Sequence, residues 1–158
     1  MKGAVRVRPF QREDAPALAR LFHEAVHRIG RGHYSQAQVD AWSPTVPDPA
    51  RLVEWGEDGR LLLVAVEGAE PVAFGDLESD GHLDHLYCRA DRAGTGVTAT
   101  LYAAIEAAAR ERGLTRLYTE ASEPARRFFL RQGFAVEHRR DFQLNSVAIY
   151  NYRMSKAL

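Results

Sequence analysis

The sequence of 158 residues predicts a single α/β domain with a mixed sheet, spanning residues 1–158. Three observations lead to this prediction. Apolar runs typical of strands lie near both ends of the chain and in its middle. Apolar residues with helical spacing occur before and between these runs. A loop that contains glycines joins a strand directly to a helix within residues 83–112.

The N-terminal third is predicted to be mainly helical. Residues 5–9 alternate apolar and basic side chains, as a half-buried strand does. Residues 13–29 carry apolar side chains at helical spacing, and Pro16 falls in the first turn, where proline is tolerated. Gly30 and Gly32 then end this helix.

Two short helices follow, each with a recognisable start. Ser35 and Gln38 have the spacing of a capping box, which predicts a helix through Trp42. Asp48 followed by Pro49 suits the cap and first position of another helix. Both starts depend on local side-chain chemistry alone.

The remaining chain is predicted to alternate strands with helices. Residues 97–112 and 125–132 are the predicted helices, and residues 144–146 are the turn of a final hairpin. The predicted strands are residues 61–67, 72–77, 83–88, 117–122, 135–143 and 147–154.

Composition excludes several classes of function. With 46% hydrophobic residues the chain can bury one sizeable core. The 21 basic and 21 acidic residues balance, so no overall charge favours nucleic acid or a membrane surface. No apolar run approaches the roughly 20 residues of a membrane span, and no signal peptide is recognisable. We therefore expect a cytoplasmic protein without a nucleic-acid or membrane partner.

The loop at residues 89–96 separates a predicted strand from a predicted helix and contains Gly94 and Gly96. Glycines in this position expose backbone N–H groups, and the helix dipole adds partial positive charge. The loop is therefore predicted to bind an anion, and phosphate is the best match.

The elements after this loop carry a resemblance to a known family. A strand at residues 117–122 leads to a helix at 125–132, which ends at Gly133 and Phe134. This order resembles the GCN5-related N-acetyltransferase superfamily over nearly the whole chain. The resemblance implies a mixed, mostly antiparallel central sheet flanked by helices. It also implies that acetyl-coenzyme A is the acyl donor.

The glycine loop departs from the usual family pattern, Arg/Gln-x-x-Gly-x-Gly/Ala. Ala93 stands where Arg or Gln is common, Arg92 comes one place early, and Thr98 replaces the final small residue. The resemblance nevertheless implies a set of coenzyme-binding residues along the preceding strand, the loop and the later helix. They are Leu86, Tyr87, Cys88, Arg92, Ala93, Gly94, Thr95, Gly96, Val97, Thr98, Ser122, Phe128 and Phe129.

Acyl transfer to an amine needs a group that accepts the amine proton. Glu120 is the first candidate, because it ends a strand where some relatives carry a catalytic glutamate. Asp84 is the second candidate. Asp84 and His85 point to opposite faces of their strand, so only one of them faces the substrate. Asp76 on the preceding strand is a further option.

The chain differs from the family mainly at the position of the residue that donates a proton to the leaving thiolate. Many relatives have Tyr four residues before the Gly-Phe pair, but this chain has Phe129 there. Either the thiolate leaves unassisted, or Tyr34, Tyr87 or Tyr118 substitutes. Packing against the sheet is the favoured role of Phe129.

The segment between the first two helices is predicted to border the acceptor. The predicted substrate-binding residues are therefore His33, Tyr34 and Trp42. His23 and His27 share a helix face, but no third ligand is evident, so no metal site is expected.

The expected activity is transfer of an acetyl group to a primary amine of a small molecule or peptide by direct attack. An acyl-coenzyme A sensor without turnover is the alternative. A nucleotide is a third option for the loop, but no Walker lysine or ribose-binding acid has suitable spacing. A homodimer is a possible assembly.

Overall fold

The computed structural model describes residues 4–158, so residues 1–3 of the predicted domain lie outside the described residues. Short 3-10 turns precede α1, link α1 to α2 and follow β5. The helices and strands are β1 (Val5–Pro9), α1 (Ala15–Arg28), α2 (Gln36–Trp42), α3 (Pro49–Glu57), β2 (Leu61–Glu67), β3 (Glu70–Leu77), β4 (His82–Leu83), β5 (Leu86–Cys88), α4 (Val97–Glu111), β6 (Arg116–Ala121), α5 (Glu123–Arg131), β7 (Ala135–Leu144) and β8 (Val147–Ala157).

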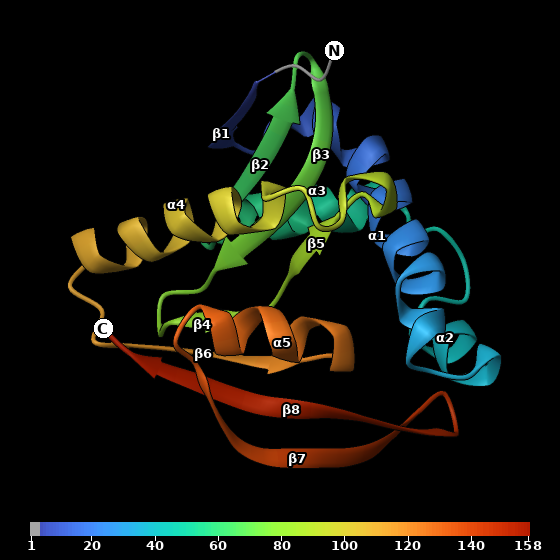
Figure 1. Ribbon diagram of the computed structural model, residues 1–158. Helices are drawn as coiled ribbons and strands as arrows, with labels where there is room; N and C mark the ends of the chain where they lie inside the picture. Colours follow the sequence, from blue (N-terminus) through green and yellow to red (C-terminus); the bar gives the residue numbers. More distant parts are fainter. Residues whose placement is uncertain (1–3) are drawn as a thin grey trace.

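The strands form two four-stranded sheets that diverge from each other (Figure 1). The first sheet has the order β1-β2-β3-β5 and is antiparallel throughout. The second has the order β4-β6-β8-β7, in which β4 and β6 are parallel and the other pairs antiparallel. The α/β class and the mostly antiparallel arrangement are therefore confirmed.

Helices cover both sheets but leave open the line along which the two sheets diverge. Helix α4 lies on one face of the first sheet, α1 and α3 lie on the other, and α5 covers the second sheet (Figure 1). One buried cluster joins α4 and α5 to strands of both sheets through Leu63, Leu101, Phe129 and Met154. This shared core holds the two sheets together. No helix within residues 4–158 is long and apolar enough to cross a membrane.

The predicted strand at residues 83–88 is wrong, because the chain leaves one sheet and joins the other within it. His82–Leu83 pairs with β6, Leu86–Cys88 pairs with β3, and Asp84 and His85 lie between. The Oδ1 atom of Asp76 accepts the backbone N–H groups of Asp84 and His85, each at 2.8 Å. A buried carboxylate therefore supplies the partners that a neighbouring strand would otherwise provide.

The local starts and turns follow side-chain chemistry. The capping box of Ser35 and Gln38 is present, and the Asp48 side chain accepts the N–H of Ala50, so both predicted helix starts are confirmed. Ser122 caps α5 instead of ending the preceding strand. The hairpin turn has two residues, Asn145 and Ser146, both at positive φ, where the sequence predicted three.

Candidate active site

Two cavities adjoin at the line where the sheets diverge. The wide cavity measures about 360 Å³ and is lined by residues of α1, α2, β6, β7 and β8 together with the segment between β4 and β5. The narrow cavity measures about 170 Å³ and lies beside α1, β5 and the start of α5. The residues that line both are Trp42, Leu86, Tyr87, Ser122 and Ala125.

The narrow cavity is mainly apolar and reaches the glycine loop. Cys88, Ala93, Thr98 and Phe128, all predicted to bind coenzyme, line it. Beside them the 15-residue helix α4 begins after Gly96 without a side-chain cap. Its first N–H groups therefore have no partner from a cap and are suited to an anion.

The loop glycines adopt a backbone conformation that other residues rarely adopt. Gly94 has φ +74° and Gly96 has φ +91°, and a Cβ added at either would meet nothing within 4 Å. The space in front of the loop is thus open to a ligand.

Strand β5 has one open edge, because β3 is its only partner strand among residues 4–158. Backbone hydrogen bonds join Asp76 to His85 and Val72 to Arg89 on either side of the paired stretch. Since hydrogen-bonded pairs alternate in an antiparallel ladder, Leu86 and Cys88 direct their N–H and C=O groups away from β3. These groups are available to an extended ligand.

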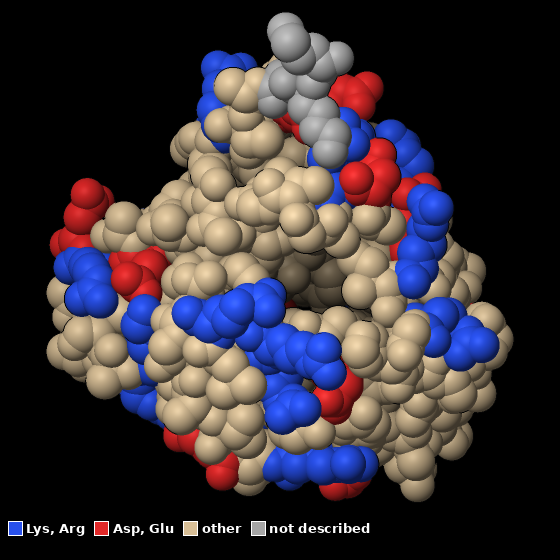
Figure 2. All heavy atoms as spheres, in the orientation of Figure 1, with Lys and Arg blue, Asp and Glu red and all other residues tan. Residues whose placement is uncertain are grey.

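Basic side chains gather beside the narrow cavity. Figure 2 shows a hollow between α4 and α5, bordered by Lys and Arg over α5. Helix α5 carries Arg126, Arg127 and Arg131. Arg92, in contrast, is held by Glu67, which accepts from its Nε at 2.7 Å. Arg92 therefore anchors the glycine loop to the end of β2.

In the wide cavity the best placed titratable group is His85. Its Nδ1 lies 2.8 Å from Oδ2 of Asp76, a carboxylate with no exposed side-chain area. Burial favours a higher pKa for Asp76, but hydrogen bonds from His85 and Arg60 outweigh it and lower the pKa. An ionised Asp76 fixes Nδ1 as the donor, which leaves Nε2 of His85 to accept a proton.

Asp84 lines the wide cavity together with His85, so the prediction that only one of them faces it is wrong, because both lie in the break between β4 and β5 and not within a strand. The Arg60 guanidinium lies 3.0 Å from Asp84, 2.9 Å from Asp76 and 2.8 Å from Asp58. The side chain of Asp84 is 39% exposed. Because Asp84 is already ion-paired with Arg60, the geometry favours His85 for this role.

Glu120 lines the wide cavity, as expected of a catalytic residue, but both of its oxygens are engaged. His82 Nε2 lies 2.7 Å from Oε1, and Arg153 donates to Oε2 at 2.7 Å. Burial alone raises the pKa of Glu120, whereas His82, Arg153 and Arg140 together lower it by more. Such a carboxylate holds a proton poorly.

The three candidate phenols differ in position. Tyr34 donates to Tyr150 O and accepts the N–H of Glu123, and burial raises its pKa to about 12. Tyr118 donates to Asp80 and lines neither cavity. Tyr87 lines both cavities, and burial raises its pKa. A phenol with a raised pKa keeps its proton until a stronger base forms beside it.

Phe129 is 2% exposed and also lines the wide cavity. Its ring packs edge-on against Phe134, with the centroids 4.9 Å apart, and against Tyr102 and Phe128. This aromatic cluster agrees with the packing role favoured from the sequence.

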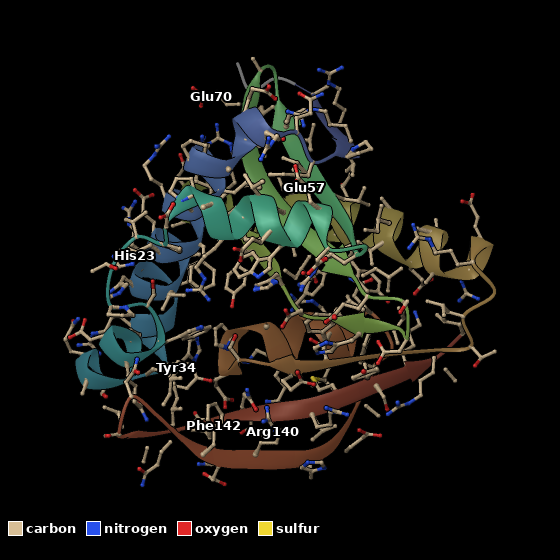
Figure 3. All side chains as sticks on the ribbon, turned by 180° about the vertical axis from the view of Figure 1, so that it is seen from behind. His23, Tyr34, Glu57, Glu70, Arg140 and Phe142 are labelled. Atoms are coloured by element: carbon tan, nitrogen blue, oxygen red, sulfur yellow. The ribbon has the colours of Figure 1, made fainter. Side chains whose placement is uncertain are left out.

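The predicted acceptor residues are only partly brought together. Tyr34 and Trp42 line the wide cavity, and their rings meet edge-on. His33 is exposed and lines neither cavity. Figure 3 shows Tyr34 beside the hairpin that carries Arg140 and Phe142. The hairpin closes this cavity opposite His85 and its neighbours.

Sequence reasoning missed two features of the site. The pairing of Asp76 with His85 had no local pattern, since the two residues lie on different segments and meet across the break. Arg140 and Phe142 were hidden in an ordinary strand pattern. Their two-residue spacing places them on one face, which was the only available indication.

In the described part of the chain, residues 4–158, groups able to hold a cation come together at two places. These are Asp76, Asp84 and His85, and also Glu78, His82 and Asp84. Arg60 already supplies a positive charge to the first set. His23 and His27 instead bond to Ser43. The lack of a metal stays a prediction.

Comparisons with known proteins agree with one another. The acetyltransferase (GNAT) domain family matches residues 31–156. The uncharacterized N-acetyltransferase YafP of Escherichia coli strain K12 is 26% identical over 150 residues, which cover 95% of this chain and 94% of that protein.

Solved structures are similar over the whole chain. A GCN5-related N-acetyltransferase described as "Aminotransferase, Class-II", from Rhodopseudomonas palustris, is 31% identical with a TM-score of 0.91, covering 100% of this chain and 98% of that one. The PaiA N-acetyltransferase of Thermoplasma acidophilum, solved with coenzyme A, is 19% identical with a TM-score of 0.79, covering 98% and 99%. The YncA acetyltransferase of Salmonella typhimurium, solved with acetyl-CoA, is 16% identical with a TM-score of 0.77, covering 98% and 94%. The fold, the divergent sheets and the sequence match together mean that this chain belongs to the GCN5-related N-acetyltransferase family.

Proposed function

We propose that this protein transfers the acetyl group of acetyl-coenzyme A to a primary amine of a small molecule or peptide, by direct attack of the amine on the thioester. The observation that carries the proposal is the meeting of the two cavities at Tyr87. The narrow cavity has an uncapped helix start suited to phosphate, and the wide cavity has a paired imidazole suited to an amine.

The donor binds in the narrow cavity in this proposal. The α4 start and its glycine loop receive the pyrophosphate, and the arginines of α5 stand beside the same hollow. The pantetheine arm pairs with the open edge of β5, where Leu86 and Cys88 direct their backbone groups outward. An N–H group of this edge stabilises the oxyanion of the tetrahedral intermediate.

The proton transfers follow from the positions of His85 and Tyr87. The amine nitrogen forms a bond to the thioester carbon, and its proton passes to Nε2 of His85, directly or through water. Asp76 holds Nδ1–H and stabilises the imidazolium that results. The carbon–sulfur bond then breaks, and Tyr87 gives its proton to the departing thiolate. His85 and Tyr87 regain their starting protonation from solvent.

Thiol release from acetyl-coenzyme A against a panel of primary amines tests this proposal. We expect amine-dependent release at least tenfold above hydrolysis, with one acetyl group found on the amine by mass spectrometry. Tight coenzyme A binding without release for any amine would refute the proposed activity.

Coenzyme A binding without thiol release is the result expected if the protein is a sensor. The observation that favours a sensor is Phe129, a buried ring without a proton at the position where relatives have Tyr. Against it stands Tyr87, which lines both cavities and keeps its proton.

A further inference from the structure

The two carboxylates that line the wide cavity each contact a cation. Asp84 pairs with Arg60, and Glu120 pairs with His82 and Arg153. These cations are shared with carboxylates outside the cavity, since Arg60 also pairs with Asp58 and Asp76, and His82 with Glu78. None of the three is therefore free to bind an anionic group of the acceptor.

Arg140 on β7 is a further cation that lines this cavity. Its Nη1 donates to the neutral Oδ1 of Asn151 at 3.1 Å, and no carboxylate among residues 4–158 lies within ion-pair distance of it, although its charge acts on Glu120 at longer range. Its guanidinium also lies over the Phe142 ring, 5.2 Å from the centroid. The side chain is half-buried, so its charge is less screened than on an open surface.

The neighbouring residue is a natural comparison. Arg139 is exposed on the other face of the same strand, where it pairs with Asp141 at 3.0 Å and stacks on Tyr150. One arginine of this pair therefore has a close ion-pair partner, whereas the other faces the cavity without one. Figure 3 shows Arg140 and Phe142 together on the hairpin.

The wall beside Arg140 is apolar. Phe142 and Leu144 share its face of β7, and Ile149 lies opposite Phe142 on β8. A cavity of about 360 Å³ is at the small end of ligand sites, so the acceptor that it encloses is small.

We propose that the acceptor is an amino acid-like molecule: a primary amine that also bears a carboxylate and an apolar or aromatic body. This inference rests on the proposed function and names its substrate class. Arg140 binds the carboxylate through its guanidinium fork, and Phe142, Leu144 and Ile149 receive the apolar body. The amine then faces His85, on the opposite wall. Asn151 orients Arg140 by accepting a hydrogen bond from its Nη1.

Matched pairs of amines test the inference. Phenylalanine and phenethylamine share an apolar body and differ in the carboxylate, as do leucine and 3-methylbutylamine. We expect kcat/KM for the carboxylate-bearing member to exceed that of its partner at least tenfold in the parent protein. Arg140→Gln should reduce this preference at least tenfold, mostly through KM, and Arg140→Lys should restore part of it.

Arg139→Gln is the matched control, and it should keep both the activity and the preference. Equal or better turnover of phenethylamine by the parent would overturn the inference while leaving the proposed function intact. A preference that survives Arg140→Gln would also overturn it. If no amine releases thiol, the proposed function fails by itself.

Product binding gives a readout that does not need turnover. We expect calorimetry to show N-acetylphenylalanine binding at least tenfold more tightly than N-acetylphenethylamine, with the difference lost in Arg140→Gln and kept in Arg139→Gln. Equal affinity of the parent for the two products would refute carboxylate recognition. Thermal melting of each variant separates these effects from misfolding.

Discussion

The Asp76 side chain accepts the backbone N–H groups of Asp84 and His85, the Nδ1–H of His85 and one N–H of Arg60, although it is fully buried. Two of these bonds replace strand pairing where the chain passes from one sheet to the other. A third orients the imidazole in the wide cavity. One residue therefore links the break in the strand to the chemistry beside it.

Substituting His85 and Glu120 one at a time distinguishes the two candidate bases. We expect His85→Gln to lower kcat about 10²-fold at pH 7 with unchanged coenzyme A affinity, because only proton transfer is lost. The deficit should shrink at high pH, where the amine is already neutral. Glu120→Gln should affect kcat less and lower the free energy of unfolding by about 1–3 kcal/mol, since His82 and Arg153 lose a charged partner.

Steady-state kinetics and calorimetric coenzyme A binding measure the first effect, and denaturant unfolding measures the second. A His85→Gln protein with full activity at pH 7, beside an inactive Glu120→Gln, would return the catalytic role to Glu120.

The proton donor is tested at Tyr87. Tyr87→Phe removes only a hydroxyl at the junction of the cavities, and we expect kcat to fall about tenfold or more when the thiolate must leave unassisted. Tyr118→Phe, at a residue that lines neither cavity, is the control and should keep its kcat. Phe129→Tyr should not raise kcat, and its added hydroxyl costs about 1–3 kcal/mol of stability if it finds no partner. A Tyr87→Phe protein as fast as the parent would exclude this donor.

At the scale of elements, the start of α4 and the edge of β5 act together. Helix α4 begins without a side-chain cap, β5 has an unpaired edge, and residues of both line the narrow cavity. Unsatisfied N–H groups normally cost stability. Their concentration beside one cavity is what a ligand with phosphates and an extended amide chain can satisfy.

Gly96→Val tests the glycine loop. A β-branched side chain would enter the open space before α4 and strain the positive φ, so we expect coenzyme A affinity to fall at least tenfold, or roughly 1.4 kcal/mol. Gly68→Val is the control, because Gly68 also has positive φ and open space but lies in the β2–β3 turn. Equal calorimetric affinity of the Gly96 variant and the parent would remove the loop from the site.

At the scale of the molecule, polar side chains tie the two sheets together beside the shared core. His82 on β4 lies 2.7 Å from Glu78, which follows β3, and 2.7 Å from Glu120 on β6. The hydrogen bond to Glu120 and that to Glu78 raise the pKa of His82 to about 9, against the opposing effect of burial. The protonated ring is therefore part of the folded state at neutral pH.

A raised pKa stabilises the fold only while the ring is protonated. This contribution is complete below about pH 6.5, the ordinary value, and is lost as the pH rises through about 9. We expect His82→Gln to lower the free energy of unfolding by roughly 2 kcal/mol at pH 6 and by much less at pH 10. Urea unfolding at several pH values between 6 and 10 measures this loss of stability, with His138→Gln, at an exposed histidine, as the control. A deficit independent of pH would contradict this account.

Much of the fold follows from patterns within a few residues. The capping box at Ser35 and the cap at Asp48 are satisfied by neighbours in the chain, so their helices could be predicted. The break at Asp84 could not be predicted, because the apolar residues on either side of it resemble one continuous strand. Only Asp76, brought alongside by the β3–β5 pairing, makes the break stable.

The sequence by itself determined the order of strands and helices apart from the break at Asp84, the glycine loop before α4 and the resemblance to the family. All of these depend on local spacing. The tertiary structure decided which polar side chains are partners. Glu120 meets His82 across 38 positions of the chain, and Arg140 faces the cavity while Arg139 turns to its own ion pair. Such pairings depend on strand register and on the direction of each side chain, which no short pattern encodes.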